Sequence, residues 1–147
     1  MKIIQATSSN LDQLLPLFEG YRNFYNQSSN PEAAKMFLSE RFQNKDSIIF
    51  IAFDENKNGV GFTQLYPTFS SVSMKCLYIL NDLYIISNAR GKGIGKALIN
   101  HAKQFAIRSK CKGLTLETAN DNPAQKLYER LGWKKDIDVI HYTWEIK

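Results

Sequence analysis

A glycine-rich loop between a strand-like run and a helix-like run constrains the fold of this chain more than any other feature. The loop reads ARGKGIGKALI, with glycines at 91, 93 and 95. Residues 76–86 before it, CLYILNDLYII, favour a strand, and apolar residues after it recur at helical spacing to about residue 110. Such a junction directs backbone N–H groups and the positive end of the helix dipole at one place. The loop therefore predicts an anion site, most often for phosphate.

The spacing of the glycines argues against two common phosphate binders. A nucleoside triphosphate loop needs four residues between its glycine and its Gly-Lys pair, followed by Ser or Thr. Here Gly91 and Gly95 enclose three residues, and Ala97 follows Lys96. A dinucleotide fingerprint fails as well, because its third glycine falls on Lys96 or Leu98. A glycine-rich helix start without a ligand remains the alternative.

Length and composition predict a folded protein with a single domain, residues 1–147. Hydrophobic residues make up 44% of the chain, which is enough for one core. The net charge is +5, but the basic residues are spread among acids without interleaved stacking aromatics, so we expect no nucleic-acid partner. The N-terminus lacks a signal-peptide pattern and no apolar run is long enough to span a membrane. We expect a cytoplasmic protein with no membrane partner.

The two cysteines and two histidines give no metal or disulfide signature. Cys76, His101, Cys111 and His141 do not fall at a ligand spacing such as C-x-x-C, so we expect no metal site. Each cysteine stands in an apolar, strand-like context, which favours two separate buried thiols over a disulfide.

The periodicity of apolar residues predicts an α/β (α+β) fold: a mixed, mostly antiparallel sheet of six to seven strands with helices on both faces. Pro16 should kink or divide the first helix, which Ser8 or Ser9 can cap, and Pro67 should stop the third strand. A right-handed crossover should pair the strand before the glycine loop in parallel with the strand after its helix. We expect strands at 2–6, 47–54, 60–67, 76–86, 113–119 and 139–146, and helices at 8–25, 30–43, 93–110 and 120–132.

These motifs resemble a known family. Arg90-x-x-Gly93-x-Gly95 at the strand-to-helix junction is similar to the (Q/R)-x-x-G-x-G/A signature of the GNAT superfamily of acetyl-CoA-dependent N-acetyltransferases. The stretch LYILNDLYI before the loop resembles their fourth strand, and NPAQKLYERLGW resembles their C-terminal tyrosine helix. The order of expected elements also matches the GNAT acyl-CoA N-acyltransferase fold from end to end.

The resemblance implies acetyl-CoA as the co-substrate and a set of residues that bind it. The pantetheine chain should run along the strand before the loop, and the loop should hold the pyrophosphate. Residues at the start of the tyrosine helix should line the far side, although Asn120, Asp121 and Asn122 remain alternatives at that position. The expected binding residues are Leu83, Tyr84, Ile85, Arg90, Gly91, Lys92, Gly93, Ile94, Gly95, Lys96, Asp121, Asn122 and Ala124.

The resemblance also suggests catalytic roles. Tyr128 matches the tyrosine that protonates the leaving thiolate, although an aromatic on a core-facing helix would look the same. Asp82 matches one member of the acidic pair of polyamine acetyltransferases and is the candidate base. Glu117 is the other acidic candidate and is expected to contact the acceptor, although a salt bridge or a loop-capping role would explain either carboxylate equally well. Tyr21 and Tyr25 could contact the acceptor, or simply pack at a helix edge.

The expected function is transfer of an acetyl group from acetyl-CoA to a primary amine of a small molecule, polyamine- or amino-acid-like, in a ternary complex. Acetylation of a protein lysine or N-terminus, and a CoA-binding sensor without turnover, are the alternatives. By analogy with relatives we expect a homodimer.

Overall fold

The computed structural model describes residues 1–147, which form two compact units, Met1–Glu117 and Thr118–Lys147. The first unit holds one sheet, three α-helices and two short 3₁₀ helices, Ser8–Asn10 and Ser87–Ala89. Its strands are β1 (Lys2–Gln5), β2 (Ile48–Phe53), β3 (Gly59–Ser70), β4 (Lys75–Ile85) and β5 (Leu114–Thr115). Its α-helices are α1 (Leu11–Phe24), α2 (Pro31–Asn44) and α3 (Ile94–Arg108).

The sheet has the order β1-β2-β3-β4-β5 and confirms the predicted mixed topology. Neighbouring strands are antiparallel from β1 to β4, whereas β4 and β5 are parallel and are joined by the α3 crossover. The predicted number of six to seven strands is wrong, because the sheet has five. A register shift on β3 between Gln64 and Leu65 places a bulge at Asn81 of β4.

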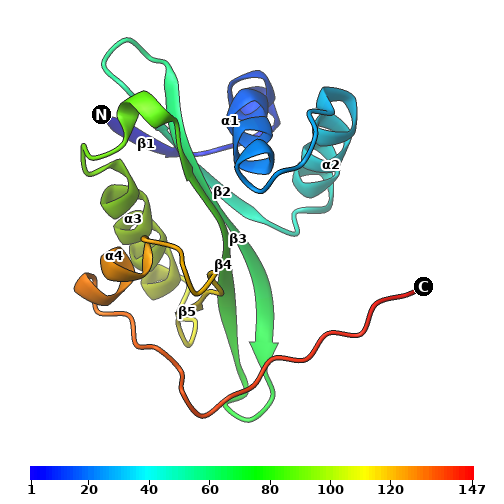
Figure 1. Cartoon of the computed structure of the whole chain (residues 1–147), viewed down its shortest axis with the longest axis vertical. Coiled ribbons are helices and arrows are strands. Elements are labelled where there is room, and N and C mark those ends of the chain that lie inside the picture. The colour runs from blue at the N-terminus through cyan, green and yellow to red at the C-terminus, as the bar shows by residue number, and fades with distance from the viewer. The chain divides into compact units, whose positions relative to one another are not determined.

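Helices cover both faces of the sheet, as predicted. Figure 1 shows α1 and α2 on one face and α3 on the other. On the first face, fully buried Leu14 and Leu38 pack with Phe62 of β3. On the other face, Phe50 of β2 packs against Phe105 of α3, with ring centroids 5.6 Å apart. These two apolar layers fix the sheet between its helices.

The ends of α1 and α2 follow capping chemistry, with two differences from expectation. Thr7, and not Ser8 or Ser9, caps the N-terminal turn, since its side chain accepts from the Ser9 N–H. Pro16 lies inside α1, which runs unbroken past it, so the expectation that Pro16 could divide the helix is wrong. Asn30 caps α2 by accepting from the Ala33 N–H, and Pro31 takes the first helical position, where no N–H is needed for an intrahelical bond.

Pro67 does not stop β3, which continues to Ser70, so this prediction is also wrong. Pro67 pairs in register with Tyr78 of β4. The pairing of β2 with β3 ends at Leu65, so beyond that residue β3 has a neighbour on one side only. A proline is tolerated there because its missing N–H can face the unpaired side.

The prediction of two separate thiols is wrong as well. Cys76 and Cys111 form a disulfide, with Cα atoms 5.0 Å apart and a sequence separation of 35. The crossover returns the chain beside the start of β4, where the Lys112 N–H donates to the Cys76 carbonyl at 2.7 Å. Parallel pairing of distant segments therefore brings the two sulfurs together, which no local spacing could indicate.

The second unit contains one short helix, α4 (Gln125–Arg130), within the predicted range 120–132. Residues 139–146 were predicted to close the sheet, but they belong to no strand of this chain. Beyond Gly132 the backbone forms no helix or strand (Figure 1). None of the helices of the chain has the length and apolarity needed to cross a membrane.

Candidate active site on strand β4

The edge of β4 that faces β5 is open over most of its length. β4 pairs with β5 only at Tyr78 and Ile79, whereas its pairing with β3 continues to Ile85. The Ile86 N–H donates to the Val60 carbonyl of β3, so by alternation the backbone groups of Leu83 and Ile85 point toward the open edge. Of the three predicted strand contacts, Leu83 thus directs both of its backbone groups toward the open edge. Ile85 directs its N–H there, while its carbonyl already accepts from Arg90 Nε.

Tyr84 differs from its two neighbours. Its carbonyl lies so close to β3 that a Cβ added at Gly61 would stand 2.8 Å from it. Its ring packs over α1, where a Cβ at Gly20 would come within 2.6 Å of the hydroxyl. Tyr84 therefore joins β3, β4 and α1 and has its backbone on the closed side of the strand.

The glycine loop has the conformation that an anion site requires. Gly91 and Gly93 have φ of +75° and +81°, which favour glycine, and a Cβ at either would meet nothing within 4 Å. Gly93 caps α3, and the first intrahelical bond runs from the Ala97 N–H to the Gly93 carbonyl. The N–H groups of the three residues before Ala97, namely Ile94, Gly95 and Lys96, have no carbonyl partner in their own helix. Donors and space therefore coincide at the end of β4.

Arg90 lies at the α1 side of this loop. Its Nε donates to the Ile85 carbonyl at 3.0 Å. The guanidinium lies 5.7 Å from the ring of Phe24 and 5.8 Å from that of Tyr84. Arg90 therefore links the end of β4 to the end of α1. Its contact with the cofactor stays a prediction.

Asp82 lies beside the β4 bulge in a buried hydrogen-bonded cluster. Its side chain is 2% exposed and accepts from Asn81 Nδ2 at 2.7 Å and from Gln64 Nε2. Burial raises the pKa of the Asp82 carboxyl above its usual value, although hydrogen bonds from Asn81, Gln64 and Tyr21 act in the opposite direction. A carboxyl group with a raised pKa binds a proton more readily near neutral pH.

Tyr21 connects this cluster to α1. Its hydroxyl donates to the Asn81 carbonyl at 3.2 Å, and burial followed by the charge of Asp82 raises its pKa well above the usual range. Tyr25 packs edge-on against the Tyr21 ring, with centroids 5.0 Å apart, and is itself exposed. The structure thus brings Tyr21, Tyr25 and Asp82 to the same side of the sheet, and their roles toward an acceptor stay predictions.

Two polar residues of this region were missed from the sequence. Gln64 is completely buried opposite Asp82, and its Oε1 has no hydrogen-bond partner. A glutamine within the apolar run VGFTQLY was the signal that could have found it. Glu19 on α1 is also buried, and it accepts from the Ser29 hydroxyl at 2.7 Å and the Asn30 N–H at 2.8 Å. Glu19 therefore fixes the α1–α2 loop beside the tyrosines.

The remaining predicted residues lie near or within the second unit. Glu117 comes two residues after β5 at the end of the first unit. Asn122 Oδ1 accepts from the Ala124 N–H at 2.9 Å, so Asn122 shapes the turn before α4. Tyr128 lies on α4, with its ring centroid 5.9 Å from that of Trp133. Their contacts with a cofactor stay predictions.

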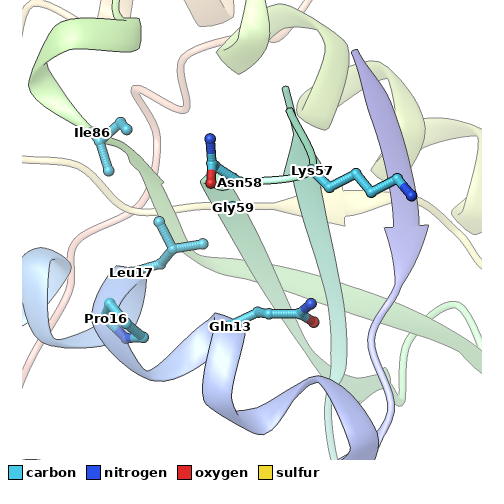
Figure 2. Close-up of a pocket in the computed structure, with 7 residues that line it drawn as sticks. All are labelled: Gln13, Pro16, Leu17, Lys57, Asn58, Gly59 and Ile86. Carbon is cyan, nitrogen blue, oxygen red and sulfur yellow. The ribbon is translucent and has the colours of Figure 1, made fainter. Parts of the chain in front are cut away.

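Two hollows in the first unit lie beside the β2–β3 turn and the end of β4. One, of about 350 Å³, is lined by α1, the β2–β3 turn and the end of β4 (Figure 2). Its lining residues are Gln13, Pro16, Leu17, Lys57, Asn58, Gly59 and Ile86. The other, of about 380 Å³, includes Lys92 and Ile94 of the glycine loop. Neither hollow gathers acidic or nucleophilic side chains around a common point, and no cluster of His, Cys, Asp and Glu could hold a metal ion.

A strand with an open edge, followed by a glycine-capped helix, has the form of a site for a ligand with an extended chain and a phosphate group. The acetyltransferase (GNAT) family model matches residues 12–133, and this chain belongs to that family. It is an acetyltransferase, and the family uses acetyl-CoA as co-substrate.

Three relatives illustrate the similarity. An uncharacterized N-acetyltransferase of Bacillus subtilis (strain 168), YhfO, is 48% identical over 99% of this chain and 98% of its own length. A probable acetyltransferase of Haemophilus influenzae is 36% identical over 88% of this chain and 97% of its own. The crystal structure of a probable acetyltransferase superposes with a TM-score of 0.94 at 43% identity, covering 100% of this chain and 99% of the other.

Proposed function

We propose that this acetyltransferase transfers the acetyl group of acetyl-CoA to a primary amine of a small, polyamine- or amino-acid-like molecule by direct attack in a ternary complex. The observation that carries the proposal is the position of Asp82. A buried carboxyl of raised pKa lies one residue from the bulge of a strand whose other edge is open. A candidate base and an open edge for the acyl donor, both on one strand, would hold the two reactants close together for acyl transfer to an amine.

The cofactor would add to the open edge of β4. Its pantetheine amide groups would bond with the backbone of Leu83 and Ile85, in the manner of an added strand. Its pyrophosphate would accept from the N–H groups between Gly91 and Lys96, with Lys92 adding positive charge. The open space beside the glycines supports this arrangement, because a ligand phosphate needs close access to the backbone.

The reaction would proceed in one displacement, with loss of protons from the acceptor nitrogen and gain of a proton by the leaving thiolate. The acceptor ammonium loses a proton to Asp82, through a water molecule or through Tyr21, since Asp82 itself is nearly inaccessible. The neutral nitrogen then forms a bond to the acetyl carbon, the carbon–sulfur bond breaks, and the nitrogen releases its remaining excess proton to solvent as the amide forms. Asp82 also passes its proton on to solvent before the next turnover. Tyr128 donates its proton to the leaving thiolate and regains one from solvent.

The aromatic residues of α1 support a small cationic acceptor. The partly buried Tyr21 lies next to the carboxyl of Asp82, and the exposed ring of Tyr25 packs against the ring of Tyr21. Aromatic faces close to a carboxylate suit an ammonium group with an aliphatic stem. A protein lysine or N-terminus would use the same chemistry, and is kept as the alternative together with a CoA sensor that has no turnover.

We also propose that the protein acts in the cytoplasm as a homodimer. Use of acetyl-CoA as the co-substrate supports the cytoplasmic location. The Cys76–Cys111 disulfide is less typical of a reducing compartment, so the cytoplasmic form should hold both cysteines mainly as thiols. Rapid alkylation of intact cells followed by mass spectrometry would test this, and a stable disulfide there would count against the location.

The function is tested by following release of free CoA thiol with a panel of polyamines, amino acids and lysine peptides. We expect turnover with one or more small primary amines and much weaker turnover with peptides. Preference for a peptide would replace the proposed acceptor class with the alternative. Tight CoA binding without turnover on any amine would favour the sensor.

Replacing Tyr128 with Phe tests the proposed acid. We expect kcat to fall roughly 10- to 100-fold, with little change in the KM for acetyl-CoA, because the ring is kept and only the proton donor is lost. Trp133→Phe is the matched control, since it alters the aromatic neighbour without removing a hydroxyl. An unchanged kcat in Tyr128→Phe would remove Tyr128 from the mechanism.

A further inference from the structure

The C-terminal segment carries a strand pattern that its own chain does not use. From Ile140 to Ile146 every second residue is apolar, and the residues between them are His141, Thr143 and Glu145. Strict alternation of this kind is typical of a strand with one buried face. In the structure the segment belongs to no strand (Figure 1).

The apolar row of this segment faces solvent. The exposed fractions of Ile140, Tyr142, Trp144 and Ile146 are 79%, 86%, 84% and 87%. Four large apolar side chains in a row are uncommon on the surface of a monomer and mark an interaction surface. An unpaired extended backbone adds main-chain donors and acceptors to that surface.

The sheet of the first unit has an edge able to receive such a strand. β5 is the last strand of the sheet, so its outer side has no neighbour. The alternating stretch GLTLETA, residues 113–119, predicts a longer strand, but only Leu114 and Thr115 are paired. A strand added beside β5 would give the rest of this stretch a partner.

We propose that two copies of this chain exchange their C-terminal segments, each adding residues 139–146 as a strand beside β5 of the other copy. This goes beyond the proposed homodimer, because it names the segment that joins the copies. A copy of this chain carries both the strand to give and the edge to receive it, so one two-fold axis satisfies both.

The area of the exchanged segments also favours a second copy. Aromatic side chains such as Tyr142 and Trp144 bury roughly 150–250 Å² each. Two exchanged segments and the surfaces receiving them can reach the roughly 1,600 Å² of a stable interface. A foreign partner would cover one segment and leave the edge of β5 unpaired. The full-length match with relatives includes this segment, so it is a regular part of such chains.

The mass of the protein in solution gives the first test. Light scattering after size exclusion should give a dimer for the natural chain, and a monomer for Tyr142→Asp, in which a charge falls in the apolar row. Thr143→Asp is the matched control, since it adds the same charge on the polar row and should stay dimeric. A monomeric natural chain, or a dimer that survives in a chain ending at residue 138, would overturn the exchange.

Trp144 provides a second readout that does not depend on a disruptive variant. In Trp133→Phe, Trp144 is the remaining tryptophan. Its emission should be blue-shifted at concentrations where the protein is dimeric and should move to the red as dilution gives monomers. Blue emission from a monomer would mean that the segment folds onto its own chain, and red emission from a dimer would mean that the segment is not the interface.

Photo-cross-linking locates the receiving edge. A benzophenone amino acid in place of Tyr142, in dimers mixed from ¹⁴N and ¹⁵N chains, should give mixed-isotope cross-links to peptides containing residues 113–117. Cross-links confined to one isotope would overturn the exchange. Loss of acetyltransferase activity in any of these experiments bears on the proposed function alone, because none of the readouts uses turnover.

Discussion

The two sides of strand β4 differ in almost every physical respect. The side facing β3 is paired from Lys75 to Ile85, with one bulge, and lies under α1. The side facing β5 is paired at only two positions, Tyr78 and Ile79, and then opens. The closed side can bury a carboxyl group in a hydrogen-bonded cluster, while the open side presents backbone groups to a ligand. A single strand can therefore supply both halves of an acyl-transfer site.

The largest expected effect comes from the open side. Gly93→Val puts a β-branched residue at a φ of +81°, and its side chain would occupy the space left for a phosphate. Loss of two or more charge-assisted N–H contacts, at about 1.5–3 kcal/mol each, corresponds to a loss of CoA affinity of roughly 1000-fold. Calorimetric titration with CoA measures this.

Gly93→Asn is the control for the open side. Asparagine tolerates positive φ far better than valine, so the helix start should persist and CoA affinity should fall much less. Equal loss in both variants would mean that the side chain itself, and not the backbone conformation, decides binding. Normal affinity in Gly93→Val would remove the loop from the site.

The second largest effect is expected at the Cys76–Cys111 disulfide, which joins the start of β4 to the segment before β5. It closes a loop of 35 residues, and the loss of such a crosslink costs roughly 3–4 kcal/mol of the free energy of unfolding. We expect Cys111→Ser to lower stability by this amount in denaturant titrations. Reductant should lower the stability of the natural protein equally and leave the variant unchanged. An additional effect of reductant on the variant would contradict this account.

Asp82→Asn tests the closed side. Removing the proposed base should lower kcat/KM roughly 100-fold, and should remove the acidic limb of the pH profile, which we expect above the usual pH range of an aspartate. Asn81→Ala removes one hydrogen bond to the carboxyl and keeps Asp82, so it should shift that limb upward. A full acidic limb in Asp82→Asn would assign the base elsewhere.

The same variant should not lose stability at neutral pH. Because the folded pKa of Asp82 is raised, the folded state binds its proton more tightly than the unfolded state. The resulting stabilisation is present at low pH and is lost as the pH rises through the folded pKa. Asparagine does not ionise, so Asp82→Asn should be at least as stable as the natural protein near pH 7, measured by thermal unfolding.

Among the variants expected to lose function or stability, Glu19→Gln should show the smallest loss. Hydrogen bonds from Ser29, Asn30 and Arg22 lower the pKa of Glu19 although burial alone would raise it. The stabilisation is therefore present above the unfolded pKa and is lost as the pH falls through the folded pKa. We expect a loss of about 1–2 kcal/mol at neutral pH and a flatter acid limb of the stability curve. Equal acid sensitivity in the natural protein and the variant would contradict this role.

Local patterns predicted those parts of the fold whose causes are local. The glycine loop, the strand before it and the helix after it all form where the sequence places them. The start of the second helix near residue 30 and the two strands expected at 47–54 and 60–67 are also confirmed. Each depends on the conformational preference of a few adjacent residues, which the sequence displays directly.

The errors concern features that depend on distant neighbours. Pro67 was predicted to end a strand, but β2 ends first and leaves room for a proline. The burial of Gln64 and its bond to Asp82 depend on the register of β3 against β4. Cys76 and Cys111 were predicted to be separate thiols, but they form a disulfide because the parallel crossover returns the chain beside β4. None of these neighbours lies within reach of a local pattern.

The sequence by itself determined the strand-loop-helix motif, because glycines of positive φ and helix periodicity are properties of short segments. The family resemblance to acetyltransferases followed from that motif and is confirmed. Only the tertiary structure decided which side of β4 opens, which polar groups surround Asp82, and whether residues 139–146 find a partner within their own chain. These depend on the register of strands far apart in sequence, and register is set by packing across the whole sheet.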